Sequence, residues 1–117
     1  MPTRNDALSK QLSKSQEITI TTTGRKSGRA ISLPVWFVLE DEKVYLLPVK
    51  GSDTQWYKNV LDNPAMEIEA GGAKGQFHIT PLTAKSEVSS VVEKFRAKYA
   101  GDVKKYYSKF DVAVVAE

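Results

Sequence analysis

Short runs of alternating apolar and polar residues constrain the fold of this chain more than any other feature. Residues 17–23 alternate isoleucine with polar residues and are rich in β-branched side chains, which is typical of a strand. Residues 31–37 repeat the alternation, with one face formed by Ile31, Leu33, Val35 and Phe37. A third strand is expected at residues 44–49. Because such alternation buries one face of an antiparallel sheet, the first half is predicted to form an antiparallel meander.

The second half adds three predicted strands and one long helix. A Gly-Gly pair separates residues 65–70 from residues 73–82, which is a good hairpin signal. Apolar residues then recur at helical spacing through residues 88–99, so an amphipathic helix is expected there. The chain is expected to close on a strand at residues 110–115.

A short helix is expected between the two halves. Ser52 and Gln55 have the spacing of a capping box, and Asn63 precedes a proline that ends the helix. The order of elements therefore predicts an α+β domain with about six mostly antiparallel strands and two to three helices packed around them. That number of strands suits a small barrel, which removes its own sheet edges.

The chain is long enough for one modest core, and we expect residues 17–117 to form a single domain. Residues 1–16 are polar apart from Leu8 and Leu12, which lie four positions apart, so a helix or a flexible arm is expected. No apolar run is long enough to span a bilayer, and the polar N-terminus lacks a signal-peptide core. A cytoplasmic protein is therefore expected.

Composition excludes several kinds of site. The chain has no cysteine, which excludes disulfides, thiol catalysis and cysteine-ligated metals. Its one histidine, His78, has no carboxylate or second histidine at ligand spacing, so no metal site is expected. The 17 Lys and Arg residues exceed the 14 Asp and Glu residues by three. This mildly basic charge suits an anionic small ligand.

One loop carries the features of an anion-binding site. Residues 21–29 read TTTGRKSGR, with two glycines four apart, three cations and several hydroxyls. Glycines let the backbone approach a ligand closely, and Arg and Lys bind phosphates strongly. The spacing of a Walker loop is absent. The alternative is a solvated hairpin turn.

Three further motifs follow in order: Pro34-Val35-Trp36, Val49-Lys50-Gly51, and WYKNVLDNP at residues 56–64. With the loop, they resemble the deazaflavin (coenzyme F420)-dependent nitroreductase family, whose members carry a T-T-G-R-K-[ST]-G loop, a lysine–glycine step and a W-Y-x-N-L-x-x-N-P helix. The tail at residues 106–115 also looks like that family's closing segment. The resemblance implies a split β-barrel of the flavin-reductase type.

The resemblance also implies a cofactor site. Its loop would hold the phosphate and acidic tail of F420, and its lysine–glycine step would lie along the deazaflavin ring. The cofactor-binding residues expected on this basis are Thr22, Thr23, Gly24, Arg25, Lys26, Ser27, Arg29, Pro34, Val49, Lys50 and Gly51. One residue departs from the pattern: Ile31 stands where relatives usually carry an arginine. This departure leaves flavin mononucleotide (FMN) open as the alternative cofactor.

Aromatic side chains are candidates for the acceptor pocket. Trp36, Trp56 and Tyr57 could form its walls, although aromatics on a short helix also suit a core. Tyr107 is the one candidate for a catalytic role, as a phenolic donor to a reduced substrate. The sequence shows no nucleophile or acid–base constellation, which is compatible with an enzyme whose cofactor supplies the chemistry.

The resemblance predicts an oxidoreductase that transfers hydride from a reduced deazaflavin to an electron-poor organic acceptor, such as a quinone, an enone or a nitro compound. Two alternatives stay open: an FMN-dependent reductase on the same barrel, and a non-catalytic flavin- or tetrapyrrole-binding protein. Nucleic acid is not expected as a partner, because cations and aromatics are not interleaved on one strand face. A homodimer is a further expectation.

Overall fold

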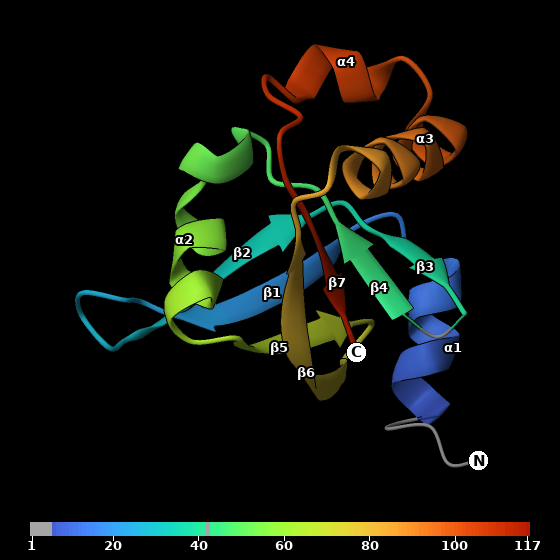
Figure 1. The fold of residues 1–117 in the computed structure, drawn as a ribbon. Helices are drawn as coiled ribbons and strands as arrows, with labels where there is room; N and C mark the ends of the chain where they lie inside the picture. Colours follow the sequence, from blue (N-terminus) through green and yellow to red (C-terminus); the bar gives the residue numbers. More distant parts are fainter. Residues whose placement is uncertain (1–5, 42) are drawn as a thin grey trace.

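The computed structural model of the chain describes residues 6–41 and 43–117 (Figure 1). Within them lie four α-helices, one 3-10 helix and seven strands. In chain order these are α1 (Asp6–Lys14), β1 (Ile18–Thr23), β2 (Ala30–Val35), β3 (Val38–Glu40), β4 (Lys43–Leu46), η1 (Gly51–Asp53), α2 (Gln55–Asp62), β5 (Ala65–Ala70), β6 (Ala73–Leu82), α3 (Lys85–Tyr99), α4 (Asp102–Tyr106) and β7 (Ala113–Ala116).

The strands form one antiparallel sheet in the order β2-β1-β5-β6-β7-β4-β3, curled into a half-barrel. The predicted α+β class with a small antiparallel barrel is confirmed. The seventh strand is β3, which begins at Val38, just beyond the run expected at residues 31–37; β2 ends at Val35, and β3 lies on the opposite edge of the sheet. The last strand begins at Ala113 rather than at residue 110.

The edge position of β2 changes which of its side chains are buried. Ile31 was expected on the buried face, yet 41% of its surface is exposed. It lies at the hairpin end of the edge strand, whereas Leu33 and Val35 pack against the core. The same position explains how Pro34 is accommodated, since an edge strand tolerates a residue without an N–H group.

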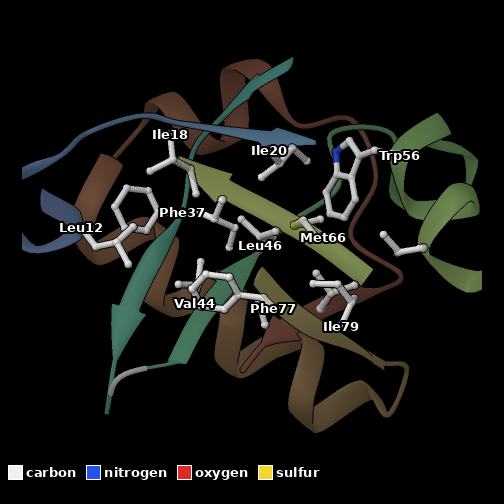
Figure 2. Close-up of a cluster of buried hydrophobic side chains, with 14 of the residues drawn as sticks. Leu12, Ile18, Ile20, Phe37, Val44, Leu46, Trp56, Met66, Phe77 and Ile79 are labelled. Atoms are coloured by element: carbon white, nitrogen blue, oxygen red, sulfur yellow. The ribbon is translucent and has the colours of Figure 1, made fainter. Parts of the chain in front are cut away.

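The main core fills the inside of the curled sheet (Figure 2). Its centre includes Phe37, Leu46 and Met66, all almost fully buried. Helix α1 contributes the buried side chains of Leu8 and Leu12. Residues 1–5, part of the segment expected as a helix or arm, lie outside the described residues. None of the helices in the described part of the chain has the length and apolar character needed to cross a membrane.

A second core lies under α3. Its apolar stripe has the spacing expected from the sequence, and all five residues are buried: Val88, Val91, Val92, Phe95 and Tyr99. Lys98 and Tyr99, at the end of α3, form hydrogen bonds with the backbone at the corner between β2 and β3. The hydroxyl of Tyr99 lies 2.7 Å from the carbonyl oxygen of Gln16 and accepts from the backbone N–H of Phe37 at 3.2 Å. Lys98 Nζ donates to the Phe37 carbonyl at 2.8 Å.

The start of α2 differs from the prediction. Ser52 does not cap the helix, because it lies in η1, and α2 begins at Gln55 after Thr54 without a side-chain cap. Thr54 Oγ1 instead accepts a hydrogen bond from the backbone N–H of Lys50 at 2.9 Å. The hydroxyl therefore stabilises the turn before the helix rather than the helix itself.

Removing the Tyr99 hydroxyl should destabilise this corner. In Tyr99→Phe the buried N–H of Phe37 loses its acceptor, so the free energy of unfolding should fall by about 1–3 kcal/mol in urea titrations. Tyr106→Phe is the matched control, since the Tyr106 side chain is exposed and its hydroxyl makes no hydrogen bond within the described residues. Equal stabilities of the two variants would contradict a role for the Tyr99 hydroxyl.

Candidate functional site

A cavity of about 540 Å³ opens beside the edge strand β2. Three segments that are distant in the sequence line it: residues of β1–β2, the segment from β4 to α2, and the end of α4. The lining residues are Glu17, Leu33, Pro34, Val35, Trp36, Leu47, Val49, Lys50, Asp53, Thr54, Gln55, Trp56, Tyr106 and Tyr107. We call this cavity the groove. It contains five of the residues predicted for the site, namely Pro34, Trp36, Val49, Lys50 and Trp56, together with Tyr107.

Aromatic rings form one wall of the groove. Trp36 stacks on Tyr99 with ring centroids 4.3 Å apart and an angle of 7° between the planes. Tyr106 meets Trp36 edge-on at 5.6 Å, and Tyr107 lies 6.0 Å from it. Trp56 closes the wall on the side of α2, where Figure 2 shows it beside Ile20 and Met66. The groove therefore offers flat apolar surfaces that suit a ring-shaped ligand.

Tyr57 does not join this wall. It was expected beside Trp56 in the pocket, but its side chain is buried in the main core and is not among the residues that line the groove. Burial, with a smaller effect of the Asp111 charge, raises the pKa of its hydroxyl. Trp56 is also buried in the main core, with 4% of its surface exposed, but it lines the groove as well. Neighbouring positions on a helix point about 100° apart, so the two rings have different surroundings.

The segment before β7 is hydrogen-bonded to residues 49–53, which we call the floor of the groove. Asp111 accepts from the backbone N–H of Ser52 at 2.9 Å and from its hydroxyl at 2.6 Å. Ser108 N donates to the carbonyl of Val49 at 2.9 Å. Gly51, at φ +55, lies directly against Asp111, where a Cβ would collide with the carboxylate. The lysine–glycine step thus needs its glycine for both conformation and space.

Charges around this floor are unevenly paired. Lys109 Nζ lies 3.2 Å from a carboxylate oxygen of Asp53 and 3.6 Å from one of Asp111. Lys50 is exposed and makes no ion pair within the described residues. Lys109 pairs with Asp53 and Asp111, whereas the ammonium of Lys50 carries an unpaired charge at the groove.

The predicted loop lies against α2. Arg25 donates from Nη1 to Asn59 Oδ1 at 2.8 Å and from Nη2 to Gln55 Oε1 at 2.9 Å. Its backbone N–H also points to Asn59 Oδ1, at 3.3 Å. Asn59 is buried, so these bonds fix the loop to the helix. Arg25 is therefore first a positioning residue, with a role in holding the loop that the sequence did not indicate.

The other loop residues divide into two groups. Lys26 and Arg29 are exposed, and their side chains make no ion pair or hydrogen bond in the part of the chain that the structure describes. Ser27 Oγ accepts from the Arg29 backbone at 3.2 Å. Thr22 is buried, and its hydroxyl has no hydrogen-bond partner among the residues that the structure describes, so it does not reach the loop surface. Thr23 ends β1 beside Gly24.

A smaller cavity of about 260 Å³ lies over this loop. Its lining residues are Gly24, Arg25, Lys26, Ser27, Ile31, Gln55 and Asn59. Gln55 lines both this cavity and the groove, so the two are neighbours along one side of α2. One elongated ligand could therefore occupy both. Among the described residues, no three His, Cys, Asp or Glu side chains gather closely enough to hold a metal ion.

Comparisons with known proteins agree with this fold. The family model described as "Uncharacterized protein conserved in bacteria (DUF2255)" matches residues 9–114. None of the curated proteins matches the sequence. Among solved structures, an F420-H2 dependent reductase (FDR-A) is similar, with 22% identity and a TM-score of 0.68 over 87% of this chain and 94% of that chain.

Two other solved structures share the fold. One is described as a domain-swapped dimer, with 23% identity and a TM-score of 0.69 over 87% of this chain and 80% of that chain. The other is HutZ, a heme storage protein from Vibrio cholerae, with 12% identity and a TM-score of 0.71 over 98% of this chain and 89% of that chain. The fold expected from the resemblance is thus confirmed, whereas membership of the deazaflavin-dependent family stays a prediction.

Acid should weaken the floor of the groove through Asp111. Hydrogen bonds from Ser52 hold the pKa of Asp111 below its ordinary value of 3.8, against the opposing effect of burial. Because this pKa is lower in the folded protein than in the unfolded chain, the carboxylate stabilises the fold at pH values above the pKa of the unfolded chain. This contribution is lost as the pH falls through the lower pKa of the folded protein. Urea titrations from pH 5 downward should therefore show a steeper loss of stability for the wild type than for Asp111→Asn. Parallel curves would contradict this contribution of the carboxylate.

Proposed function

The chain belongs to the bacterial family DUF2255, and we propose that it is a small oxidoreductase that binds the reduced deazaflavin F420 and reduces an electron-poor organic acceptor. The observation that carries the proposal is the joining of two unlike cavities at Gln55. One is lined by aromatic and aliphatic side chains, and the other is lined by the unpaired cation Lys26 and by Arg25. A ligand with a flat ring and an anionic arm matches both.

The side chains fit such a cofactor. Lys26 and Arg29 would bind the anionic arm, because neither charge is offset by a carboxylate. Lys50 would face a carbonyl or phosphate oxygen of the ring-bearing part, since its charge is likewise uncompensated. The volume of the groove lies within the range of about 300–1,000 Å³ that is usual for small-molecule sites. The similar fold of an F420-H2 dependent reductase supports the same assignment.

When bound, a reduced deazaflavin supplies the hydride, and the protein supplies position and hydrogen bonds. Trp36 and Trp56 would hold the acceptor flat and exclude water from it. Tyr107 would donate a hydrogen bond from its hydroxyl to the reduced oxygen of the acceptor. Its ring is buried at the groove, burial raises the pKa of its hydroxyl, and that hydroxyl makes no hydrogen bond within the described residues.

A second candidate is an FMN-dependent reductase, which Ile31 favours. Relatives in the resembled family usually carry an arginine at this position, and here an exposed isoleucine lines the loop cavity instead. Fewer cations suit a single phosphate better than a long polyanion. A non-catalytic tetrapyrrole carrier is the third outcome, since HutZ shares the fold. A homodimer, as one neighbour forms, is an additional expectation.

Titration with F420 and FMN tests the proposal. Wild-type protein should bind F420 more tightly than FMN, and added salt should weaken F420 binding, because exposed charges are screened over ~8–10 Å. Replacing Lys26 and Arg29 by alanine should weaken it roughly 30-fold, taking ~1 kcal/mol for each contact. Ile31→Arg should tighten F420 binding and leave FMN binding unchanged.

Controls separate binding from folding. The double variant of Lys26 and Arg29 should keep its free energy of unfolding, whereas Arg25→Ala should lose stability as well as affinity, because Arg25 holds the loop to Asn59. Alanine at Lys10 and Lys85, which lie outside both cavities, removes the same charge and should leave affinity unchanged. Tight FMN binding with no F420 binding at low salt would overturn the choice of cofactor, and no binding of either would overturn the proposed activity.

The role of Tyr107 is testable with the loaded enzyme. Tyr107→Phe should slow reduction of a quinone by about 10²-fold, the lower end for a positioned proton donor, without changing the dissociation constant of F420. Because the hydroxyl makes no bond in the described fold, stability should not change. Tyr106→Phe is the control on the adjacent aromatic. An unchanged turnover in Tyr107→Phe would leave this tyrosine as packing only.

A further inference from the structure

An acidic side chain lines the groove at the end away from the cationic loop. Glu17 lines it beside the start of β1, whereas Gln55 lines it on the side of the loop. Ile18 pairs with Val35, and Thr23 pairs with Ala30 at the hairpin end. Five steps along β1 at ~3.3 Å each separate these ends by roughly 17 Å. The acidic side chain therefore lies a strand's length away from the cationic loop.

Glu17 has an uncompensated charge. Its side chain is exposed and forms no ion pair among the described residues. Burial and, to a smaller extent, the carboxylate of Glu17 raise the pKa of Tyr99. Tyr99 is the ring on which Trp36 stacks. The carboxylate thus lies within electrostatic range of the Trp36–Tyr99 pair.

Aromatic faces and edges surround the same end. Trp36 is only partly buried, and 54% of Tyr106 is exposed where it stands edge-on to Trp36. The face of an aromatic ring carries partial negative charge and attracts a cation, and a nearby carboxylate adds to that attraction. Neither the rings nor the carboxylate require a hydrogen-bond donor on the ligand. A quaternary ammonium group therefore suits the site as well as a protonated amine.

We propose that Glu17, Trp36 and Tyr106 form a subsite for an organic cation, so that Glu17 selects positively charged aromatic acceptors over neutral and anionic ones. The assignment of this subsite to the acceptor rests on the proposed function, in which the cofactor binds at the end of the groove next to the loop. A positive charge conjugated with a ring also makes that ring electron-poor, as a hydride acceptor must be. Glu17 is a specificity-determining residue here and takes no part in the chemical step.

A matched pair of ligands tests the subsite without any cofactor. (4-Hydroxyphenyl)trimethylammonium and 4-tert-butylphenol have the same shape and differ in one positive charge. Both tryptophans of the chain, Trp36 and Trp56, line the groove, so tryptophan fluorescence reports binding directly. At a slightly acidic pH the phenolic hydroxyls of both ligands are protonated, so the ligands differ only in the ammonium charge. The wild type should then bind the ammonium ligand about three- to tenfold more tightly.

The preference should fall in Glu17→Gln to the small part that the aromatic rings alone provide. Glu87→Gln is the charge-matched control, since Glu87 lies at the start of α3 outside the groove, and it should keep the wild-type preference. Equal affinity of the wild type for both ligands would overturn the cation subsite. An undiminished preference in Glu17→Gln would overturn the role of Glu17. Because cofactor titrations are separate from this experiment, failure of the subsite and failure of the proposed F420 binding are distinguishable.

Discussion

The pairing of β7 between β6 and β4 is the interaction on which the rest of the structure depends. In the described sheet, β3 and β4 connect to the other strands only through β7, and all four residues of β7 are buried. The segment that leads into β7 crosses the end of β4, where Ser108 bonds to Val49 and Asp111 bonds to Ser52. The hydrogen bonds that assemble the floor of the groove therefore lie next to the strand that closes the sheet, and they join residues about 60 positions apart in the chain.

The pairing of charges follows a division between scaffold and site. Lys109 is surrounded by Asp53 and Asp111, and together they hold the C-terminal segment on η1. Arg25 has amide oxygens as its partners rather than carboxylates, so it fixes the loop without cancelling the loop's positive charge. Lys26, Arg29 and Lys50 stay unpaired in the described structure. These three side chains give the loop and the groove positive charge that no ion pair among the described residues offsets.

The alternation of residues predicted most of the sheet, because strands with one buried face follow that pattern wherever they lie. It could not identify the edge of the sheet, and so Ile31 was assigned to the core although β2 has no partner on its outer side. The apparent capping box at Ser52 failed because Ser52 lies in η1, where its hydroxyl donates to the distant carboxylate of Asp111, and α2 begins only at Gln55. Local spacing also made Tyr57 a neighbour of the pocket together with Trp56, but both rings are buried in the main core and only Trp56 also lines the groove. Tertiary packing decides each of these cases, and no local pattern contains it.

The position of Gln55 restricts what the site can accept. Its side chain lines both cavities and receives a hydrogen bond from Arg25, so loop and groove have a fixed relation through one residue of α2. Under the proposed function, a ligand that used both cavities would have its ring near Trp56 and its anionic arm toward Lys26. Ile31 makes one side of the loop cavity apolar, so the cations would follow the arm for a short distance only. On that proposal, discrimination between a deazaflavin and FMN would depend on how far the anionic arm extends past Ile31, more than on the ring itself.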